Sequence, residues 1–272
     1  MSKVSKSTWL GLAIGIFCVA TSIGMSGDFR QFLNWPSVFI TVGGTLGAIV
    51  VSFPPSRLKN LGPVMKKAFT QGKTNLKEDL ETIVALSEIT RREGLLALED
   101  SIDNYNIDDD FMKRGIMLII DGADEEQLRN SLEAETYFMQ QRHQRGYGMV
   151  DMIATVAPAL SLMGTYIGLI PMLTSLEDPR RLGPLMAVEL VTSFYGAFLA
   201  YVIFSPIAKR LKTMNADEVA RREFLLEGLV AIQKGQNPKI IREELSSYLS
   251  SKQDAGAMSR QQQSEMNPKK VA

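Results

Sequence analysis

The sequence has very little of the side chains from which active sites are most often built. Its 272 residues include one cysteine, Cys18, and one histidine, His143, which excludes an internal disulfide and a pair of histidine metal ligands. The phosphate-binding pattern GxxxxGK[ST] is absent, and no serine or cysteine nucleophile has a matching base. We therefore expect no enzymatic activity, no metal site and no cofactor, and we expect no nucleic-acid partner.

Net charge is also missing, since 30 Lys and Arg balance 30 Asp and Glu, but this average hides a strong segregation along the chain. Four runs carry almost no charge, and each is long enough to cross a bilayer, which takes about 20 apolar residues. The runs cover residues 7–27, 31–56, 152–176 and 182–208. This pattern predicts an all-α, polytopic membrane protein with four transmembrane helices and a helical cytoplasmic domain.

The basic residues predict the orientation of these spans. The short links at 28–30 and 177–181 carry few of them, whereas several lie close to the other ends of the runs: Arg57, Lys59, Arg142, Arg145, Lys209, Arg210 and Lys212. Because Lys and Arg near span ends are enriched on the cytoplasmic side, both termini and the central block are predicted to be cytoplasmic.

These boundaries divide the chain into five predicted segments. They are a transmembrane hairpin at 1–56, a helical cytoplasmic domain at 57–149, a second transmembrane hairpin at 150–208, cytoplasmic helices at 209–250 and a tail at 251–272. The tail is rich in Gln, Ser and Lys and has almost no large apolar residue, which predicts disorder.

Local signals predict where the cytoplasmic helices begin. Asp108–Asp110 is expected to cap a helix over 111–120. Asp124 and Gln127 resemble a capping box, and Asn237–Pro238 forms a favourable N-cap and first-turn pair for a last amphipathic helix.

The third run is too polar along one face for a simple anchor. Ser161, Thr165 and Gly168 share a face at helical spacing, and Pro158 and Pro171 lie within the run. Small and hydroxyl residues let helices pack closely. The pattern predicts a helix that moves something across the membrane, or that packs against something that does.

The fourth run repeats the pattern and adds a carboxylate. One helix face carries Glu189, Thr192, Ser193, Gly196, Ala197 and Ala200. Hydroxyls on such a face can replace part of the hydration of a passing ion, but they also hydrogen-bond between helices, and the residue types leave both readings open. Glu189 is either a cation-attracting group at the outer mouth or a snorkelling acid exposed to water.

The central block contains a charged segment, ITRREGLLALEDSID. Arg91 and Arg92 precede Glu99 and Asp100 by eight residues. On a continuous helix this spacing is about two turns, which places a basic and an acidic patch on roughly one face. The segment is either a solvated helix surface or a docking surface for a charged partner.

These features occur together in one known family. The chain resembles the MotA/PomA stator subunits of the flagellar motor, in the MotA/TolQ/ExbB proton channel superfamily, over about residues 8–250. The motifs that carry the resemblance are RREGLLALED at 91–100, VAPALSLMGTYIGLIPML at 156–173, DPRRLGP at 178–184, TSFYG at 192–196, FSPIAKRL at 204–211 and EGLVAIQKGQNP at 227–238. Together they are highly specific, whereas each alone is weak.

The resemblance implies a homopentamer around a dimer of a MotB/PomB-like partner, a 5:2 assembly in the bacterial inner membrane. The partner supplies the ion-binding aspartate, and the stripe through Ser161, Thr165 and Gly168 is expected to face the partner's helix. The implied functional residues are an ion pathway at Thr165, Thr192, Ser193 and Glu189, conformational prolines at Pro158 and Pro206, and contacts to the rotor switch-complex protein at Arg91, Arg92, Glu99 and Asp100.

The coupling ion and two rival functions stay open at this point. Thr165, Thr192 and Ser193 align with a hydroxyl set of sodium-driven members, which favours sodium over protons, whereas Glu189 and Pro171 stand where relatives have small residues. The rivals are an ExbB/TolQ-like energiser of outer-membrane processes and a non-conducting membrane scaffold. Four spans in two hairpins, separated by a large block, favour the stator.

Overall fold

The computed structural model describes residues 6–27, 29–70, 75–105, 107–174, 176–177 and 179–248, and the predicted tail lies outside them. Every regular element of these residues is helical. The chain forms two compact units. The span unit comprises Met1–Lys73 and Gln141–Asn215, and the charged unit comprises Thr74–Gln140 and Ala216–Ala272.

Four helices of the described residues are long and apolar enough to cross a membrane. Their bounds are Ser7–Met25, Trp35–Ser52, Glu125–Thr174 and Leu182–Gln233. The predicted all-α, four-span architecture is therefore confirmed, although the last two helices are far longer than a bilayer requires.

The first two spans differ in regularity. The first is the continuous helix α1 (Lys6–Ser26), which contacts the fourth span where Gly15 faces Val202. After η1 (Phe29–Phe32), the second span is built from α2 (Trp35–Val38), the π-helix η2 (Phe39–Gly43) and α3 (Gly44–Ser52). Asn34 begins α2 by accepting a hydrogen bond from the Ser37 backbone N–H.

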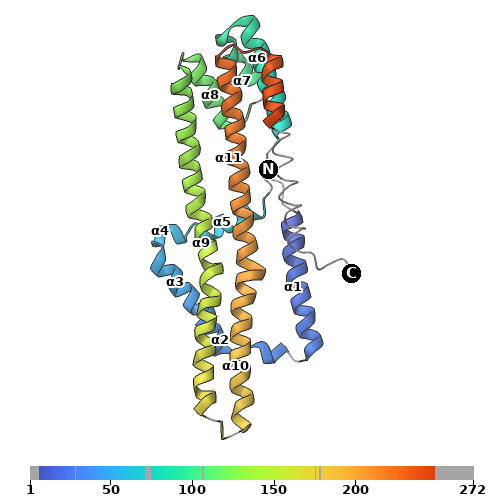
Figure 1. Ribbon diagram of the computed structural model, residues 1–272, viewed down its shortest axis with the longest axis vertical. Helices are drawn as coiled ribbons and strands as arrows, with labels where there is room; N and C mark the ends of the chain where they lie inside the picture. The colour runs from blue at the N-terminus through green and yellow to red at the C-terminus, as the bar shows by residue number, and fades with distance from the viewer. Residues whose placement is uncertain are drawn as a thin grey trace. The chain divides into compact units, whose positions relative to one another are not determined.

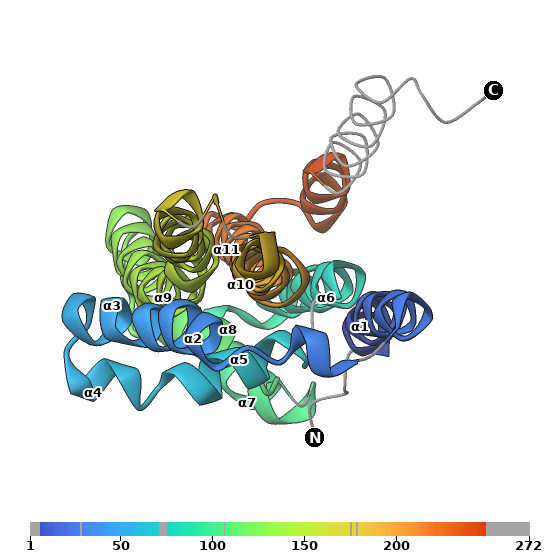
Figure 2. The same cartoon turned by 90° about the horizontal axis from the view of Figure 1, so that it is seen from below.

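The third and fourth spans form a close hairpin. Helix α9 (Glu125–Thr174) has 50 residues, and α10 (Pro179–Ala197), the π-helix η4 (Phe198–Phe204) and α11 (Ser205–Gln233) follow one another. Within the span unit, α9 and α10 run side by side (Figure 1). Figure 2 shows α2 and α3 along one side of this pair, where α2 contacts α10.

Two short helices cross the ends of the spans. The extended backbone of Pro54 ends the second span, and α4 (Pro55–Leu58) begins directly afterwards with proline in its first turn. Helix α5 (Leu61–Ala68) follows and lies across the long helices of the span unit (Figure 1).

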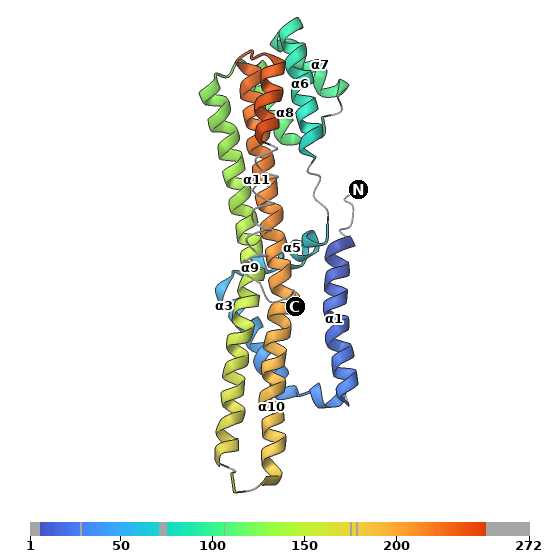
Figure 3. The same cartoon turned by 45° about the vertical axis from the view of Figure 1, so that its right-hand side comes forward.

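The charged unit is a helical cluster with a large aliphatic core. It contains α6 (Leu76–Glu93), η3 (Leu95–Ala97), α7 (Leu98–Asn104), α8 (Asp110–Ile120) and a last helix over 238–248 (Figure 3). The parts of α9 and α11 outside the span unit complete it. Its fully buried side chains include Ile83, Leu86, Ile116, Phe224 and Leu229, and their removal from water drives the packing.

The predicted helix starts in this unit are confirmed. Asp109 caps α8 by accepting hydrogen bonds from the N–H groups of Phe111 and Met112. Asp124 and Gln127 form the reciprocal capping box: Asp124 Oδ1 accepts from the Gln127 N–H at 2.8 Å, and Gln127 Oε1 accepts from the Asp124 N–H at 3.2 Å. Asn237 likewise accepts from the Lys239 N–H at 3.0 Å.

Candidate functional site

The α9–α10 hairpin is packed through glycines. A Cβ atom on Gly164 would lie 2.5 Å from Thr192 Cγ2, and one on Gly168 would lie 2.8 Å from Glu189 Cγ. The closest approach is at Gly196, where a Cβ would meet Ser161 Cβ at 2.3 Å and the backbone oxygen of Ala157 at 3.0 Å. Only glycine fits at these three positions with the helices at this separation.

Hydroxyl groups join the same helices to the second span. Ser161 Oγ donates to the backbone oxygen of Thr192 at 2.5 Å. The hydroxyl of Thr192, which is fully buried, lies 2.7 Å from Ser37 Oγ and 2.6 Å from the backbone oxygen of Val188. Three spans therefore meet at Thr192, and its hydroxyl is already engaged within the protomer.

This geometry corrects the expected direction of the stripe on span three. Ser161 is buried, and Gly168 is buried against Glu189 of the same chain. The prediction that the stripe through Ser161, Thr165 and Gly168 faces a partner's helix is therefore wrong for Ser161 and Gly168. Helical periodicity identified the stripe, but it carries no information on which neighbouring helix covers it.

The four predicted ion-pathway residues occupy different environments. Ser193 is exposed, Thr165 is half-buried and Thr192 is buried, and Thr165 Oγ1 donates to the Leu162 backbone oxygen at 2.7 Å. Glu189 is half-buried, and its Oε1 is buried without a hydrogen-bond partner among the described residues. Glu189 and Thr192 thus lie in the α9–α10 interface, whereas Ser193 is open to another chain.

The two predicted conformational prolines both interrupt helical hydrogen bonding. Pro158 lies inside α9 and Pro206 lies in the first turn of α11, directly after the π-helix η4. Each ring removes one backbone donor and leaves a carbonyl of the preceding turn unpaired in the helix. The close contact of Gly196 with Ala157 and Ser161 puts Pro158 beside the narrowest part of the hairpin.

The charged segment of the central block is not one helix, which corrects the assumed two-turn spacing. Helix α6 ends at Glu93, Gly94 adopts φ +90°, and a short 3-10 turn leads into α7. The exposed Arg91 and Arg92 therefore lie in the last turn of α6, and the exposed Glu99 and Asp100 in the first turn of α7. Each charge complements the dipole of its own helix end.

Leu96 is exposed at the turn between these two charged pairs, with 73% of its surface accessible. The surface is thus a basic helix end, an apolar turn and an acidic helix start. Such an arrangement suits docking better than a uniformly charged helix face does, because it combines an apolar centre with charged flanks.

An ion-pair network links α6, the start of α8 and α11 within the charged unit. Arg221 donates to both carboxylate oxygens of Asp79 at 2.7 and 2.8 Å and also to Asp109 Oδ2 at 2.5 Å. The hydrogen bonds that Arg221 donates to Asp79, and next those to Asp109, raise the pKa of Arg221 despite its partial burial. Burial alone would raise the pKa of Asp109, but hydrogen bonds from the Met112 N–H and Arg221 lower it.

His143 of α9 contacts both α5 and α11, and its neighbours in the sequence did not predict these contacts. Its Nδ1 lies 3.0 Å from Asn215 Oδ1 on α11, and its Nε2 lies 3.4 Å from Lys67 Nζ on α5. Because Asn215 Oδ1 is an acceptor, Nδ1 carries the proton, and Nε2 accepts from Lys67 in the neutral tautomer. No local signal predicts this link, since Lys67 and Asn215 are each more than 70 residues away.

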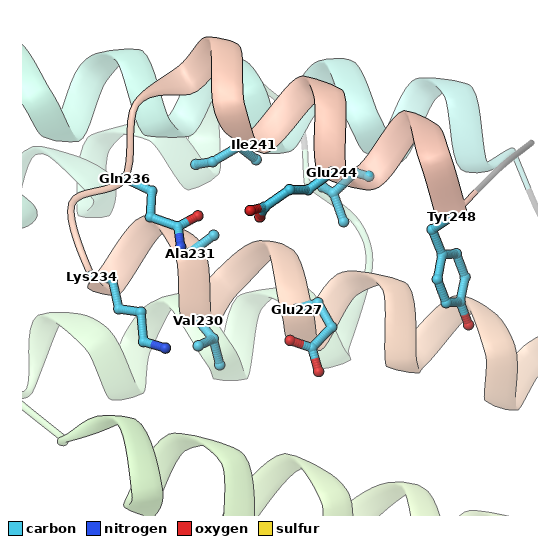
Figure 4. A pocket seen from close by; sticks show the side chains of 9 residues that line it. Glu227, Val230, Ala231, Lys234, Gln236, Ile241, Glu244 and Tyr248 are labelled. Atoms are coloured by element: carbon cyan, nitrogen blue, oxygen red, sulfur yellow. The ribbon is translucent and has the colours of Figure 1, made fainter.

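One open cavity of about 230 Å³ lies in the charged unit between the end of α11 and the last helix. Its lining includes the buried Val230 and Ile241 and the exposed Glu227 and Glu244 (Figure 4). Glu227 is bidentate with Arg129, at 2.7 and 3.1 Å, and this hydrogen bonding lowers the pKa of Glu227. Within the described ranges, no cluster of three His, Cys, Asp or Glu residues could hold a metal ion.

Taken together, the helices define a polytopic membrane protein with a glycine-packed hairpin and a charged helical unit. Residues 9–94 match the motility protein A N-terminal family model, and residues 103–224 match that of the MotA/TolQ/ExbB proton channel family. The chain therefore belongs to the motility protein A group of the MotA/TolQ/ExbB proton channel family, and the resemblance stated from its motifs is confirmed.

The relatives match over almost their whole length. The chain is 38% identical over 249 residues to the uncharacterized protein YtxD of Bacillus subtilis, covering 90% of each chain. It is 38% identical over 239 residues to motility protein A of Treponema phagedenis, covering 88% of this chain and 92% of the relative.

A solved structure agrees with these sequence relatives. The flagellar MotAB stator complex from Bacillus subtilis contains a chain that matches with a TM-score of 0.82 and 31% identity, covering 93% of this chain and 99% of that one. These matches, with the N-terminal motility model, do not favour the ExbB/TolQ-like alternative.

Proposed function

We propose that the chain is the ion-conducting stator subunit of a bacterial flagellar motor, coupling inward cation flow through an assembly with a MotB-like partner to rotation of the rotor. The observation that carries this proposal is the similarity to a stator chain over nearly the full length of both proteins. The glycine-packed hairpin supports it, because α9 and α10 form a rigid element that can move as one body.

The titrating group is proposed to come from the partner. Residues 152–176 of this chain carry no charged side chain, so α9 brings no carboxylate to the centre of the membrane. A partner aspartate would be neutralised by an ion from outside and would release it to the cytoplasm. The electrical part of the driving force is about 2.3 kcal/mol per charge per 100 mV.

The geometry divides the proposed ion-pathway residues into two roles. The exposed Ser193 and the half-buried Thr165 are proposed to face the pathway. Thr192 is proposed to act indirectly, by holding α2, α9 and α10 together through its buried hydroxyl. Glu189, midway along α10, is proposed to attract cations entering from the outside.

The assembly is proposed to be a homopentamer around a dimeric partner in the inner membrane, with both termini in the cytoplasm. In this arrangement 1–56 and 150–208 form the membrane hairpins, and 57–149 and 209–250 are cytoplasmic. Arg91, Arg92, Glu99 and Asp100 would contact the rotor, and Pro158 and Pro206 would let the hairpin bend at each step.

Swimming assays test the function and the ion together. A stator-deleted strain is complemented with this chain and its partner, and swimming speed is measured as sodium varies at fixed pH. Restored swimming that rises with sodium is the expected result. Failure to restore swimming by correctly inserted protein would contradict the stator function, whereas speed independent of sodium would contradict sodium coupling only.

Glu189 is tested in the same strain. Glu189→Gln keeps the packing against Gly168 and removes the charge, and Glu189→Asp keeps the charge on a shorter side chain. We expect Glu189→Gln to shift the sodium concentration for half-maximal speed upward and Glu189→Asp to retain most of the response. An unchanged sodium dependence in Glu189→Gln would reject a role in attracting the ion.

A further inference from the structure

The segment of α4 and α5 is an amphipathic element at the ends of the spans. Helix α5 runs across the long helices of the span unit (Figure 1). Its exposed and covered positions alternate with helical periodicity: Leu61, Val64 and Met65 are half-buried and Ala68 is buried, whereas Lys66 and Lys67 are exposed. The segment therefore has one face committed to the protein and another facing outward.

The covered face is anchored on the third and fourth spans. Ala68 is in one cluster with Val150 of α9 and with Ile207, Ala208 and Leu211 of α11. Val64 also contacts the α9 backbone closely, since a Cβ on Gly146 would lie 3.3 Å from Val64 Cγ2. These contacts fix which side of the segment is free.

An aromatic pair places this segment at the depth of the lipid headgroups. Trp9, at the start of the first span, packs against Phe69, directly after α5, with ring centroids 4.7 Å apart. Trp9 is 54% exposed although it adjoins an apolar span. Tryptophan is enriched where the membrane meets water, because its ring is amphipathic.

The free face is basic. Arg57, Lys59 and Lys66 are exposed, and no ion pair of these three is found among the described residues. Of the carboxylates described in the span unit, Asp151 is near this end of the spans, whereas Glu177 and Glu189 lie toward the opposite end. The outward side of the segment thus presents three cations, which outnumber the one described carboxylate of the span unit near this end.

We propose that the α4–α5 segment binds the phosphate groups of anionic phospholipids at the membrane interface through Arg57, Lys59 and Lys66. Amphipathic helices with a basic face bind anionic bilayers in this position. The protein's contacts hold the segment in place, so its cations meet the headgroups without a folding cost. This role is independent of ion conduction and does not rest on the stator function.

Lipid binding to the full-length chain, in the assembly in which it purifies, tests the proposal. The detergent-solubilised protein is titrated with phosphatidylglycerol and, separately, with phosphatidylcholine of the same acyl chains, and bound lipid is counted by native mass spectrometry. We expect Lys59→Gln/Lys66→Gln to weaken phosphatidylglycerol binding by about fivefold for each lysine removed and to leave phosphatidylcholine binding unchanged.

Matched variants separate charge from fold. Lys59→Arg/Lys66→Arg keeps the charge and is expected to bind like the wild type. Lys77→Gln/Lys239→Gln removes two exposed lysines of the charged unit and is also expected to bind like the wild type. Raising the salt concentration should weaken phosphatidylglycerol binding in the wild type without any mutation.

Two results would overturn the proposal. The first is equal loss of phosphatidylglycerol binding in the α4–α5 variant and the Lys77/Lys239 variant, or no loss in either. The second is displacement of phosphatidylglycerol by inorganic phosphate at the same concentration, which would assign the cations to a soluble anion instead of a lipid.

Discussion

The two units of this chain hold their helices together in opposite ways. In the span unit, α9 and α10 meet through Gly164, Gly168 and Gly196, with hydroxyl hydrogen bonds at Ser161 and Thr192. In the charged unit, large aliphatic side chains fill the space between helices, and the half-buried Arg221 joins two carboxylates.

The solvent explains the difference. Lipid tails are as apolar as leucine, so burying leucine between membrane helices yields little, and close approach with hydrogen bonding stabilises the pair instead. In water the removal of apolar surface drives association. The charged unit also has close glycines, but a Cβ on Gly115 would meet the end of the flexible Leu229 side chain, whereas one on Gly196 would also meet the backbone at Ala157.

The largest effect is expected in the charged unit, on replacing Arg221. Arg221→Met leaves the buried Asp79 and the half-buried Asp109 without their shared cation. Breaking a fully buried pair in this way costs about 3–5 kcal/mol, and the partial exposure of this network places its loss toward the lower end of that range. Hydrogen exchange followed by mass spectrometry on the full chain should show faster exchange in α6 and α8, with the span helices unchanged.

The matched control is Arg242→Met, which removes an exposed ion pair with Glu81. Exposed pairs contribute little, so its exchange pattern should match that of the wild type. If Arg221→Met and Arg242→Met changed hydrogen exchange equally, the Arg221 ion pairs would have no special part in stabilising the charged unit. That unit would then depend on its apolar core alone.

The next effect is expected at the narrowest point of the hairpin. Gly196→Ala places a methyl group against Ser161 and the Ala157 backbone, and such overpacking costs about 1–3 kcal/mol, here toward the upper end. The thermal unfolding midpoint of the solubilised full chain should fall clearly below that of the wild type.

Gly47 provides the control, because nothing lies within 4 Å of a Cβ at that position. Gly47→Ala should be neutral or slightly stabilising, since alanine favours the helix over glycine. Destabilisation by Gly47→Ala as large as that by Gly196→Ala would show that another chain covers this face, and the comparison would then have to include the assembly.

Much of the fold could be predicted because its determinants are local. The uncharged runs locate the four spans through chain composition alone, and the caps at Asp109, Asp124 and Asn237 use side chains within three residues of the N–H groups they bind. The break at Gly94 was also signalled by the sequence Arg91-Arg92-Glu93-Gly94, since basic residues in the last turn and a glycine just after it are typical of a helix C-terminus. The prediction of a two-turn spacing was wrong because it assumed that one helix continues through Gly94.

The candidate site was less predictable because it depends on contacts between distant segments. Periodicity placed Thr192 and Ser193 on one face, yet the structure buries the first and exposes the second. The difference arises from Ser37, which lies 155 residues before Thr192 in the chain and covers its hydroxyl. The role of His143 escaped for the same reason, since its neighbours come from α5 and α11.

A smaller effect is expected at the hydroxyl of the hairpin. Thr192→Val keeps the shape and removes the hydrogen bonds to Ser37 and Val188, which should cost about 0.6–2 kcal/mol. Ser193→Ala, at an exposed neighbouring position, should leave the unfolding midpoint unchanged. If both lower it equally, Thr192 has no special part in holding the three spans together.

The smallest effect is expected on lowering the pH. Acid should reduce hydrogen-exchange protection in the charged unit before it does so in the span unit, and both units of the wild type stay folded at neutral pH. The pKa of Asp109 is lower in the folded protein than in the unfolded chain, where carboxyls titrate near pH 4. The folded state therefore binds protons less readily, so Asp109 stabilises it above about pH 4, and this contribution is lost as pH falls through the lowered pKa. Exchange corrected for intrinsic rates should show α8 losing protection below pH 4, before the α9–α10 hairpin does, because residues 152–176 carry no carboxylate and residues 182–208 carry only Glu189. Asp109→Asn keeps one capping oxygen and should flatten this pH dependence at the price of lower protection at pH 7. An equally steep acid response in Asp109→Asn would assign the effect to other carboxylates of the charged unit.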